Sequence, residues 1–199
     1  TLSSMNNLAN ALTDAGDFAG ARALNQRVLE VRLRKLGEEH PDTLGSMNNL
    51  ANSLADLGAY VAARELAQRS FDLHLRVLGE EHPDTIMSMN TLANRFSDQG
   101  DFAGARVLIE RGLEVRLRSL GEEHPHTLIS MNNLANRLSD LGEYAKSRAL
   151  NERVLEVRTR KLGHEHPDTL SSMDNLANAL ADSGEITAAR TLAEQALET

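Results

Sequence analysis

The chain has 199 residues, a formal net charge of −8 and only 3% aromatic residues, so we expect no nucleic-acid partner, because nucleic-acid-binding surfaces are basic and often carry stacking rings. Hydrophobic residues make up 41% and charged residues 25%, as in ordinary globular proteins, and cysteine is absent, which excludes disulfides and thiol catalysis. No apolar run reaches the roughly 18 to 20 residues that a membrane-spanning helix needs. We therefore expect a cytoplasmic protein without membrane contact.

The sequence repeats every 42 residues without insertion. A threonine marks the same place in each repeat: Thr1, Thr43, Thr85, Thr127 and Thr169. Repeats of this kind stack on their neighbours, because none can bury its apolar face alone. We therefore predict one domain over 1–199, made of repeats 1–42, 43–84, 85–126 and 127–168 and a partial repeat 169–199.

The first predicted element of each repeat is an amphipathic helix, from Leu2 to Ala15 in the first repeat. Its apolar residues follow the i, i+3, i+4, i+7 spacing of a helix with one buried face. Gly16 then breaks the pattern, as a helix end with a left-handed residue requires. The other repeats have glycine at the same place: Gly58, Gly100, Gly142 and Gly184.

The second predicted element is a helix from about Phe18 to Leu36, antiparallel to the first. The stretch "LGEEHPDT" ends it at Gly37 and starts the next repeat. Two registers fit that restart, one with Pro41 at the first helical position and one with Asp42 as N-cap. The sequence leaves both open.

These residues resemble the tetratricopeptide repeat, in which an apolar pair, a glycine, an aromatic residue and a small alanine recur at fixed offsets: Leu8, Ala9, Leu12, Gly16, Phe18, Ala21 and Leu29. The longer period, the "LGEEHPDT" linker and "NNLA" are similar to the 42-residue type of kinesin light chain and of many bacterial proteins. The resemblance implies an all-α fold, a right-handed α-solenoid superhelix of antiparallel helix pairs. It also implies a non-enzymatic scaffold that binds proteins or peptides in a concave groove.

The stretch "SMNNLAN" and its near copies place two rows of polar side chains on the first helices. At about 100° per residue, Asn6 and Asn10 lie together opposite the apolar face, and the resemblance turns that side toward the groove. Asn can donate and accept hydrogen bonds, which suits capture of a peptide backbone; alternatively, the asparagines bond one another and hold the repeats in register. The first row is Asn6, Asn48, Asn90, Asn132 and Asp174; the second row is Asn10, Asn52, Asn94, Asn136 and Asn178.

Positions that differ between otherwise equal repeats are candidates for specificity. The third and fourth repeats combine Arg95 and Arg137 with apolar Met87 and Ile129. This combination suggests an acidic or carboxylate-bearing peptide with an apolar anchor. Alternatively, the two arginines are simply solvated at the groove edge.

Other charged residues recur with the fold and are interpreted as structural. We predict ladders that join the aspartates near the end of the first helix, such as Asp98 and Asp140, to the arginines of the second helix, such as Arg106 and Arg148. Four of the seven histidines share one linker position, so we expect no metal site. No phosphate-binding loop, metalloprotease motif or catalytic group breaks the repeat symmetry, so we expect neither catalysis nor a cofactor.

The sequence therefore predicts a peptide-binding scaffold. The alternative is a structural, self-association or sensor segment of a larger protein, such as the bacterial signalling ATPases that carry similar repeats. Self-association through the uncovered ends of the array would fit that alternative.

Overall fold

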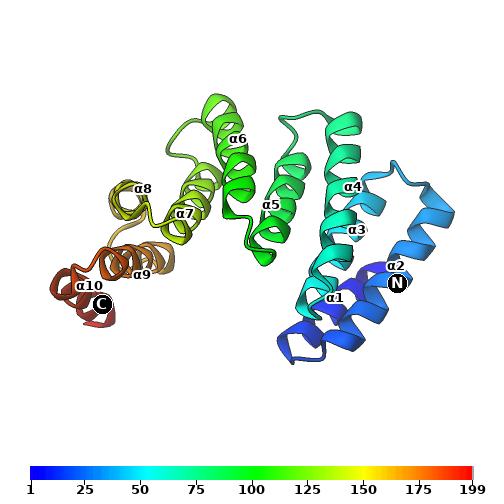
Figure 1. Ribbon diagram of the computed structural model, residues 1–199, viewed down its shortest axis with the longest axis horizontal. Helices are drawn as coiled ribbons and strands as arrows, with labels where there is room; N and C mark the ends of the chain where they lie inside the picture. Colours follow the sequence, from blue (N-terminus) through cyan, green and yellow to red (C-terminus); the bar gives the residue numbers. More distant parts are fainter. Residues whose placement is uncertain (199) are drawn as a thin grey trace. The chain divides into compact units, whose positions relative to one another are not determined.

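A computed structural model describes residues 1–198, and within them the chain forms ten α-helices and no strand (Figure 1). The all-α fold class is confirmed. The helices are α1 Leu2–Asp14, α2 Phe18–Leu36, α3 Pro41–Asp56, α4 Tyr60–Leu78, α5 Pro83–Asp98, α6 Phe102–Leu120, α7 Pro125–Asp140, α8 Tyr144–Leu162, α9 Pro167–Asp182 and α10 Ile186–Glu198.

A tight turn joins the two helices of each repeat, at the predicted glycine. Gly16 has φ 81°, a left-handed conformation that costs glycine little because it has no Cβ. The next residue, Asp17, caps α2 by accepting a hydrogen bond from the backbone N–H of Gly20 at 2.9 Å. The chain thereby reverses direction between α1 and α2 in three residues.

The linker between repeats settles the helix register that the sequence left open. Proline takes the first helical position of α3, and His40, rather than Asp42, is the N-cap. The ring nitrogen Nδ1 of His40 accepts a hydrogen bond from the backbone N–H of Asp42 at 3.1 Å. The histidines repeated in the linker thus serve helix capping; the others are His82, His124 and His166.

The chain divides into two compact units, Thr1–Leu108 and Ile109–Thr199, and the division falls within α6. In the first unit each helix from α1 to α5 packs on the next, and α3 also packs on α5. In the second unit α7 to α10 pack in the same order, and α7 also packs on α9. That the five repeats form a single domain stays a prediction.

The core of the first unit lies where successive helices meet. Leu29 of α2, Leu44 and Met47 of α3 and Leu73 of α4 are buried together. Close approach of the two helices in a repeat depends on a small residue, and Ala21 and its counterparts in the next two repeats are fully buried. The apolar pattern of the sequence therefore supplies the interfaces that stack the repeats.

Candidate functional site

A pocket of about 630 Å³ lies where α7 packs on α9, and residues at the end of α8 also line it. We call it the C-terminal pocket. Its lining is largely apolar, from Leu128 and Ile129 of α7 and Val157 and Leu162 of α8. The amide side chains of Asn132 in α7 and Asn175 in α9 also line it. An apolar cavity with a few polar groups is the usual form of a ligand-binding pocket.

The first unit has a pocket at the equivalent place, where α3 packs on α5, with a volume of about 250 Å³. We call it the N-terminal pocket. Asn48 lines it as Asn132 lines the C-terminal pocket, two repeats later in the sequence. The other equivalent lining positions differ in chemistry: Gly45, His74 and Met87 in the N-terminal pocket correspond to Ile129, Arg158 and Ser171 in the C-terminal pocket.

The first row of predicted groove residues is mostly withdrawn from solvent. Asn48 is 6% exposed, the other three asparagines of that row are half-buried, and Asp174 is exposed. The side-chain carbonyl oxygens of Asn6, Asn48 and Asn132 are buried and have no hydrogen-bond partner within the described chain. These three oxygens therefore do not take part in bonds that would hold the repeats in register.

The second row is exposed throughout and borders a different pair of cavities. Asn10 and Asn52 line a polar pocket of about 400 Å³ in the first unit, and Asn136 and Asn178 line an equivalent pocket of about 300 Å³ in the second. Aspartates accompany them in both cavities. The two rows thus differ in environment, although helical periodicity placed them together. Asn90 and Asn94 lie in α5 at the corresponding positions.

The two arginines predicted to select an acidic ligand already contact other groups of the chain. Arg95 is 8% exposed and donates from Nη1 to the backbone carbonyl of Ala51 at 3.0 Å, with its Nε 2.9 Å from the carboxylate of Asp98. Arg137 is more accessible, and its Nη1 lies 3.0 Å from the carboxylate of Asp140. Both charges thus face a carboxylate three residues further along the same helix.

Two aspartates of the predicted ladders pair with an arginine of their own helix, Asp98 with Arg95 and Asp140 with Arg137. Asp140 pairs with Arg137 of its own helix, whereas Arg148 of α8 pairs with Glu152 and Glu185. Asp140 and Arg148 therefore do not pair with each other, and ladders that run along the repeats stay a prediction. Side chains three residues apart in a helix are neighbours, which favours ion pairs within the helix.

Two buried asparagines in the second helices were not predicted from the sequence. Asn25 of α2 donates from Nδ2 to the Oγ of Ser53 at 2.8 Å and to the backbone carbonyl of Asn49 at 3.5 Å. Asn151 of α8 donates in the same way to the carbonyl of Asn175 at 3.4 Å. A polar residue on an otherwise apolar helix face was the signal available. These residues tie one repeat to the next.

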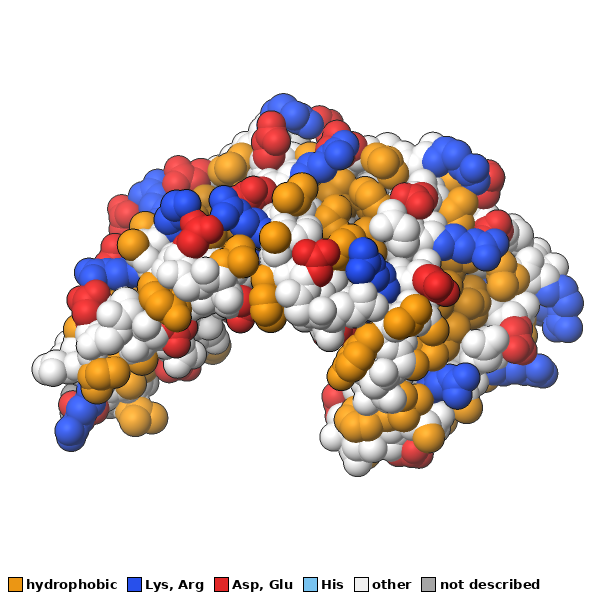
Figure 2. Space-filling model, in the orientation of Figure 1, with side chains coloured by type: hydrophobic (Ala, Val, Ile, Leu, Met, Phe, Trp, Pro, Cys, Tyr) orange, Lys and Arg blue, Asp and Glu red, His pale blue; other side chains and the backbone are white. Residues whose placement is uncertain are grey.

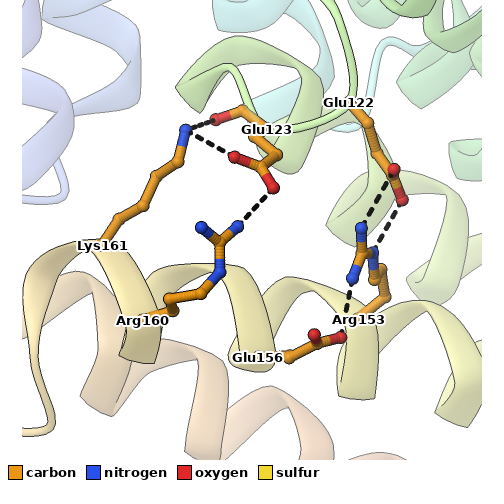
Figure 3. Close-up of polar contacts among 6 residues, drawn as sticks. All are labelled: Glu122, Glu123, Arg153, Glu156, Arg160 and Lys161. Carbon is orange, nitrogen blue, oxygen red and sulfur yellow. Dashed lines mark hydrogen bonds and ion pairs between the residues drawn. The ribbon is translucent and has the colours of Figure 1, made fainter.

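Salt bridges fix the linker that forms the rim of the C-terminal pocket (Figure 3). Arg153 of α8 donates to the carboxylate of Glu122 at 2.7 Å, and this bond lowers the pKa of Glu122. Lys161, 3.0 Å from Glu123, and Arg160 both pair with that second linker carboxylate; the hydrogen bond from Lys161 is the main cause of its lowered pKa. Since Glu123 and Lys161 both line the pocket, the rim there is charged but balanced.

Charges of both signs are interspersed on the face of the molecule drawn in Figure 2, where Lys and Arg side chains alternate with Asp and Glu. That face carries no continuous basic surface of the kind that binds nucleic acid. Within residues 1–198, no three His, Asp or Glu side chains are grouped so as to hold a metal ion. In the same part of the chain, every helix is too short or too polar to cross a bilayer.

Helix pairs that repeat every 42 residues and pack in sequence order define an α-solenoid. One tetratricopeptide repeat family model matches residues 1–42, 127–168 and 169–199, and a second matches residues 42–118. The chain belongs to the tetratricopeptide repeat family. Proteins of this family serve as scaffolds for protein interaction, and the predicted fold is confirmed.

Solved structures support the kinesin light chain-like type of repeat. Two crystal structures of nearly identical TPR-like repeats, attributed to a Podosopora anserina kinesin light chain, are each 29% identical in sequence to this chain. The alignments cover 99% of this chain and 93% of the other, with TM-scores of 0.85 for the first structure and 0.84 for the second. The predicted resemblance is thereby confirmed.

A more distant structure shows the shared fold alone. BtubC (BKLC) from P. vanneervenii is 23% identical, with 98% of this chain and 78% of that chain covered and a TM-score of 0.79. No curated protein matches the sequence.

Proposed function

We propose that the chain is a non-enzymatic scaffold that binds extended segments of a partner protein, in the first unit where α3 packs on α5 and in the second unit where α7 packs on α9. The observation that carries this proposal is the pair of equivalent pockets, one in each unit, whose linings differ in chemistry at three equivalent positions.

The asparagines of the first row suit contact with a peptide backbone. The buried side-chain oxygen of Asn132 has no partner in the free chain, which costs about 1 to 3 kcal/mol for such a group. Rotation of the amide about its last side-chain bond would offer the oxygen to a peptide N–H and the NH₂ group to a peptide carbonyl. Asn132 borders the C-terminal pocket, so one residue would hold the backbone beside the pocket that receives a side chain.

The C-terminal pocket suits a large apolar side chain of the partner. Its volume of about 630 Å³ exceeds that of the N-terminal pocket, and Ile129, 42% exposed, offers apolar surface at its edge. Burying apolar surface there would contribute about 25 cal/mol for each Å² removed from water. Pocket filling by an apolar anchor beside backbone contacts is a common mode of peptide recognition.

An acidic residue in the partner stays a prediction, and Arg137 is the residue that tests it. Arg95 is buried against Ala51, so a ligand carboxylate would have to displace internal contacts to reach it. Arg137 is only partly buried and could exchange Asp140 for a ligand carboxylate. If the partner is acidic, Arg137→Ala weakens binding and the loss grows smaller at high salt.

The test is selection of binding peptides from a random displayed library with the purified chain, followed by affinity measurement by fluorescence anisotropy. We expect Ile129→Asp and Asn132→Ala each to weaken a selected peptide at least about tenfold. Ala149→Gln, at an exposed position of α8 outside both pockets, is the matched control and leaves affinity unchanged. Equal affinity of all three variants and the wild type would exclude this surface as the binding site.

Self-association is a second candidate, favoured by apolar side chains exposed on the first and last helices. Leu8 of α1 is 52% exposed and Ile186 of α10 is 62% exposed. Packing these helices against those of another copy would cover both. Light scattering of the wild type and of Leu8→Glu with Ile186→Glu tests this role, since a dimer held by these faces dissociates in the double variant.

A further inference from the structure

An arginine near the end of the second helix joins one repeat to the next in three of the repeats. Arg32 donates from Nη1 to the backbone carbonyl of Asp42 at 2.9 Å and to the Oγ of Ser46 at 2.7 Å, in the first turns of α3. Arg158 makes the same two bonds to Asp168 and Ser172, both at 2.9 Å. Arg116 does so as well, with His126 and Ser130. This place in the fold therefore receives a guanidinium group.

In the second repeat the arginine is replaced by His74, which leaves the guanidinium position without an internal donor. His74 is 2% exposed, and its Nδ1 lies 2.8 Å from the backbone carbonyl of Ser70. A carbonyl can only accept, so Nδ1 carries the proton and Nε2 is left as an acceptor. Nε2 has no hydrogen-bond partner among residues 1–198.

The hydrogen bonds around His74 differ from those at the other three junctions. Ser88, the counterpart of Ser46, donates to the carbonyl of Thr85 at 2.7 Å and receives no arginine. The hydroxyl of Thr85 donates to the carbonyl of His74 at 3.3 Å. At the other junctions the equivalent threonine hydroxyls have no partner within the described residues. The junction has thus rearranged without regaining a cation.

The groups that line the N-terminal pocket around His74 are hydrogen-bond acceptors. The carboxylates of Asp42 and Asp84 line it, and neither pairs with a lysine or arginine in the part of the chain that the structure describes. Asp84 lies 3.8 Å from Nδ1 of His82, but that nitrogen accepts the backbone N–H of Asp84 and so bears no proton. Asn48 adds its buried, unpartnered oxygen.

The net charge of the pocket also favours a cation. Arg32, Asp42 and Asp84 are its charged lining residues, which leaves one negative charge in excess when His74 is neutral. The positive charge of Arg32 is held by its bonds to the carbonyl of Asp42 and to Ser46. In the C-terminal pocket, by contrast, Arg158 and Lys161 balance two carboxylates.

We propose that the N-terminal pocket binds the guanidinium group of an arginine side chain from the partner, beside the place where the second repeat lacks an arginine of its own. The Nε2 of His74, the carboxylate of Asp84 and the amide oxygen of Asn48 accept its N–H groups. That the arginine belongs to a partner protein rests on the proposed function. The preference of the pocket for a guanidinium group does not depend on that function.

Arginine fits the pocket better than lysine for two reasons. The guanidinium group is planar and presents five donors, so it can reach acceptors that lie on several sides of the pocket. It is also more weakly hydrated than an ammonium group, so moving it out of water costs less. At the equivalent junctions of the other repeats, the chain itself uses arginine as the donor and not lysine.

The experiment is a titration of the full chain with argininamide, followed by NMR of the histidine ring signals. Citrullinamide, which has nearly the same shape and no side-chain charge, is the control ligand. We expect saturable shifts of the His74 signals with argininamide, and at least about tenfold weaker binding of citrullinamide. Equal binding of the two ligands, or no saturable shift with argininamide, overturns the proposal.

Variants separate this site from the rest of the binding surface. His74→Arg supplies the guanidinium internally and should abolish argininamide binding, while Asp84→Asn should weaken it at least about fivefold with the helix cap kept. Asn132→Ala, at the C-terminal pocket, leaves it unchanged. Undiminished binding by either His74→Arg or Asp84→Asn also overturns the proposal.

The outcome is distinguishable from that of the peptide test. Argininamide binding is measured without a partner, so it can succeed although no library peptide is found. Conversely, selected peptides can depend on Ile129 and Asn132 while argininamide shows no binding, which would leave the scaffold function in place and exclude the guanidinium site.

Discussion

The two pockets occupy equivalent positions in the repeat and yet differ in what they can hold. The C-terminal pocket has Ile129 at its edge and a buried arginine that bonds to the next repeat. The N-terminal pocket has Gly45 in place of Ile129 and His74 in place of Arg158, and its volume is less than half that of the C-terminal pocket. A helix framework that recurs every 42 residues therefore fixes where a pocket forms, and single substitutions decide its chemistry.

The two pockets also differ because an arginine that recurs at three junctions is replaced by His74 at the N-terminal pocket. Arg32, Arg116 and Arg158 each appear as one more surface arginine until their contacts are known. Once these contacts are known, His74 is the one of the four equivalent positions that does not bond to the next repeat through an arginine. The departure lies beside the pocket that carries a negative charge in excess.

The largest expected effect comes from removing the internal arginine at the C-terminal pocket. Arg158→Ala loses two hydrogen bonds from a charged donor that is 9% exposed. We expect the free energy of unfolding to fall by about 2 to 3 kcal/mol, the usual range for such bonds. Urea denaturation followed by circular dichroism measures it. Lys161→Ala, at an exposed residue of the same pocket rim, is the control and should change stability little; equal losses in the two variants would contradict the role given to Arg158.

The reverse change at the N-terminal pocket should be stabilising. His74→Arg gains two charge-assisted bonds, to the carbonyl of Asp84 and the hydroxyl of Ser88, and loses the bond between Nδ1 and Ser70. The net gain is about 1 kcal/mol. The same urea titration measures it, and a clear loss of stability would show that the site in the second repeat no longer accepts a guanidinium group.

Gly45 tests why the edges of the two pockets differ. It lies inside α3 with nothing within 4 Å of the place a Cβ would occupy, so Gly45→Ala should raise stability by about 0.5 to 1 kcal/mol through helix propensity. Gly104 of α6 is the contrasting control, because a Cβ there would lie 2.7 Å from the carboxylate of Asp101 and from the ring of Phe96. Gly104→Ala should destabilise. Thermal unfolding of both variants gives the sign of each change.

The buried imidazole makes stability depend on pH at the N-terminal pocket. Burial lowers the pKa of His74 from its ordinary value of 6.5 and is the largest effect. The hydrogen bond to the Ser70 carbonyl and the charge of Asp84 raise the pKa by less, and His82 lowers it slightly further. The unfolded chain therefore binds a proton at higher pH than the folded chain, and stability falls as pH drops below about 6.5. The decrease should be smaller in His74→Arg. Urea midpoints between pH 7.5 and pH 5 test this, and parallel curves would contradict it.

The helices are well predicted from the sequence because the same residue pattern recurs in every repeat. The apolar spacing, the glycine turn at Gly16 and the small Ala21 each depend on residues close together in the chain, and local rules are sufficient for them. The linker was less certain, because a proline and an aspartate both signal a helix start. His40 as the cap was outside the usual set of capping residues.

The site was less predictable because side-chain partners come from other repeats. Helical periodicity placed Asn6 and Asn10 on one face, yet Asn6 is half-buried and Asn10 is exposed. Arg95 read as a groove charge, but its guanidinium reaches the carbonyl of Ala51 in the preceding repeat. The sequence periodicity gives the face of one helix and not the distance to the next.

The smallest expected effect concerns the asparagines that the two pockets share. Asn48 and Asn132 have buried oxygens without partners, so Asn48→Ala and Asn132→Ala remove no internal acceptor bond and relieve an unpaired polar group. We expect this relief to be offset by the lost packing of the amide, so that each variant changes the free energy of unfolding by less than about 0.5 kcal/mol. Asn25→Ala is the matched control, since Asn25 is as buried as Asn48 but donates to Ser53 at 2.8 Å, and it should cost about 1 to 3 kcal/mol. Comparable losses in all three variants would mean that the shared asparagines serve repeat stacking, whereas unchanged stability with weakened peptide binding would assign them to the partner.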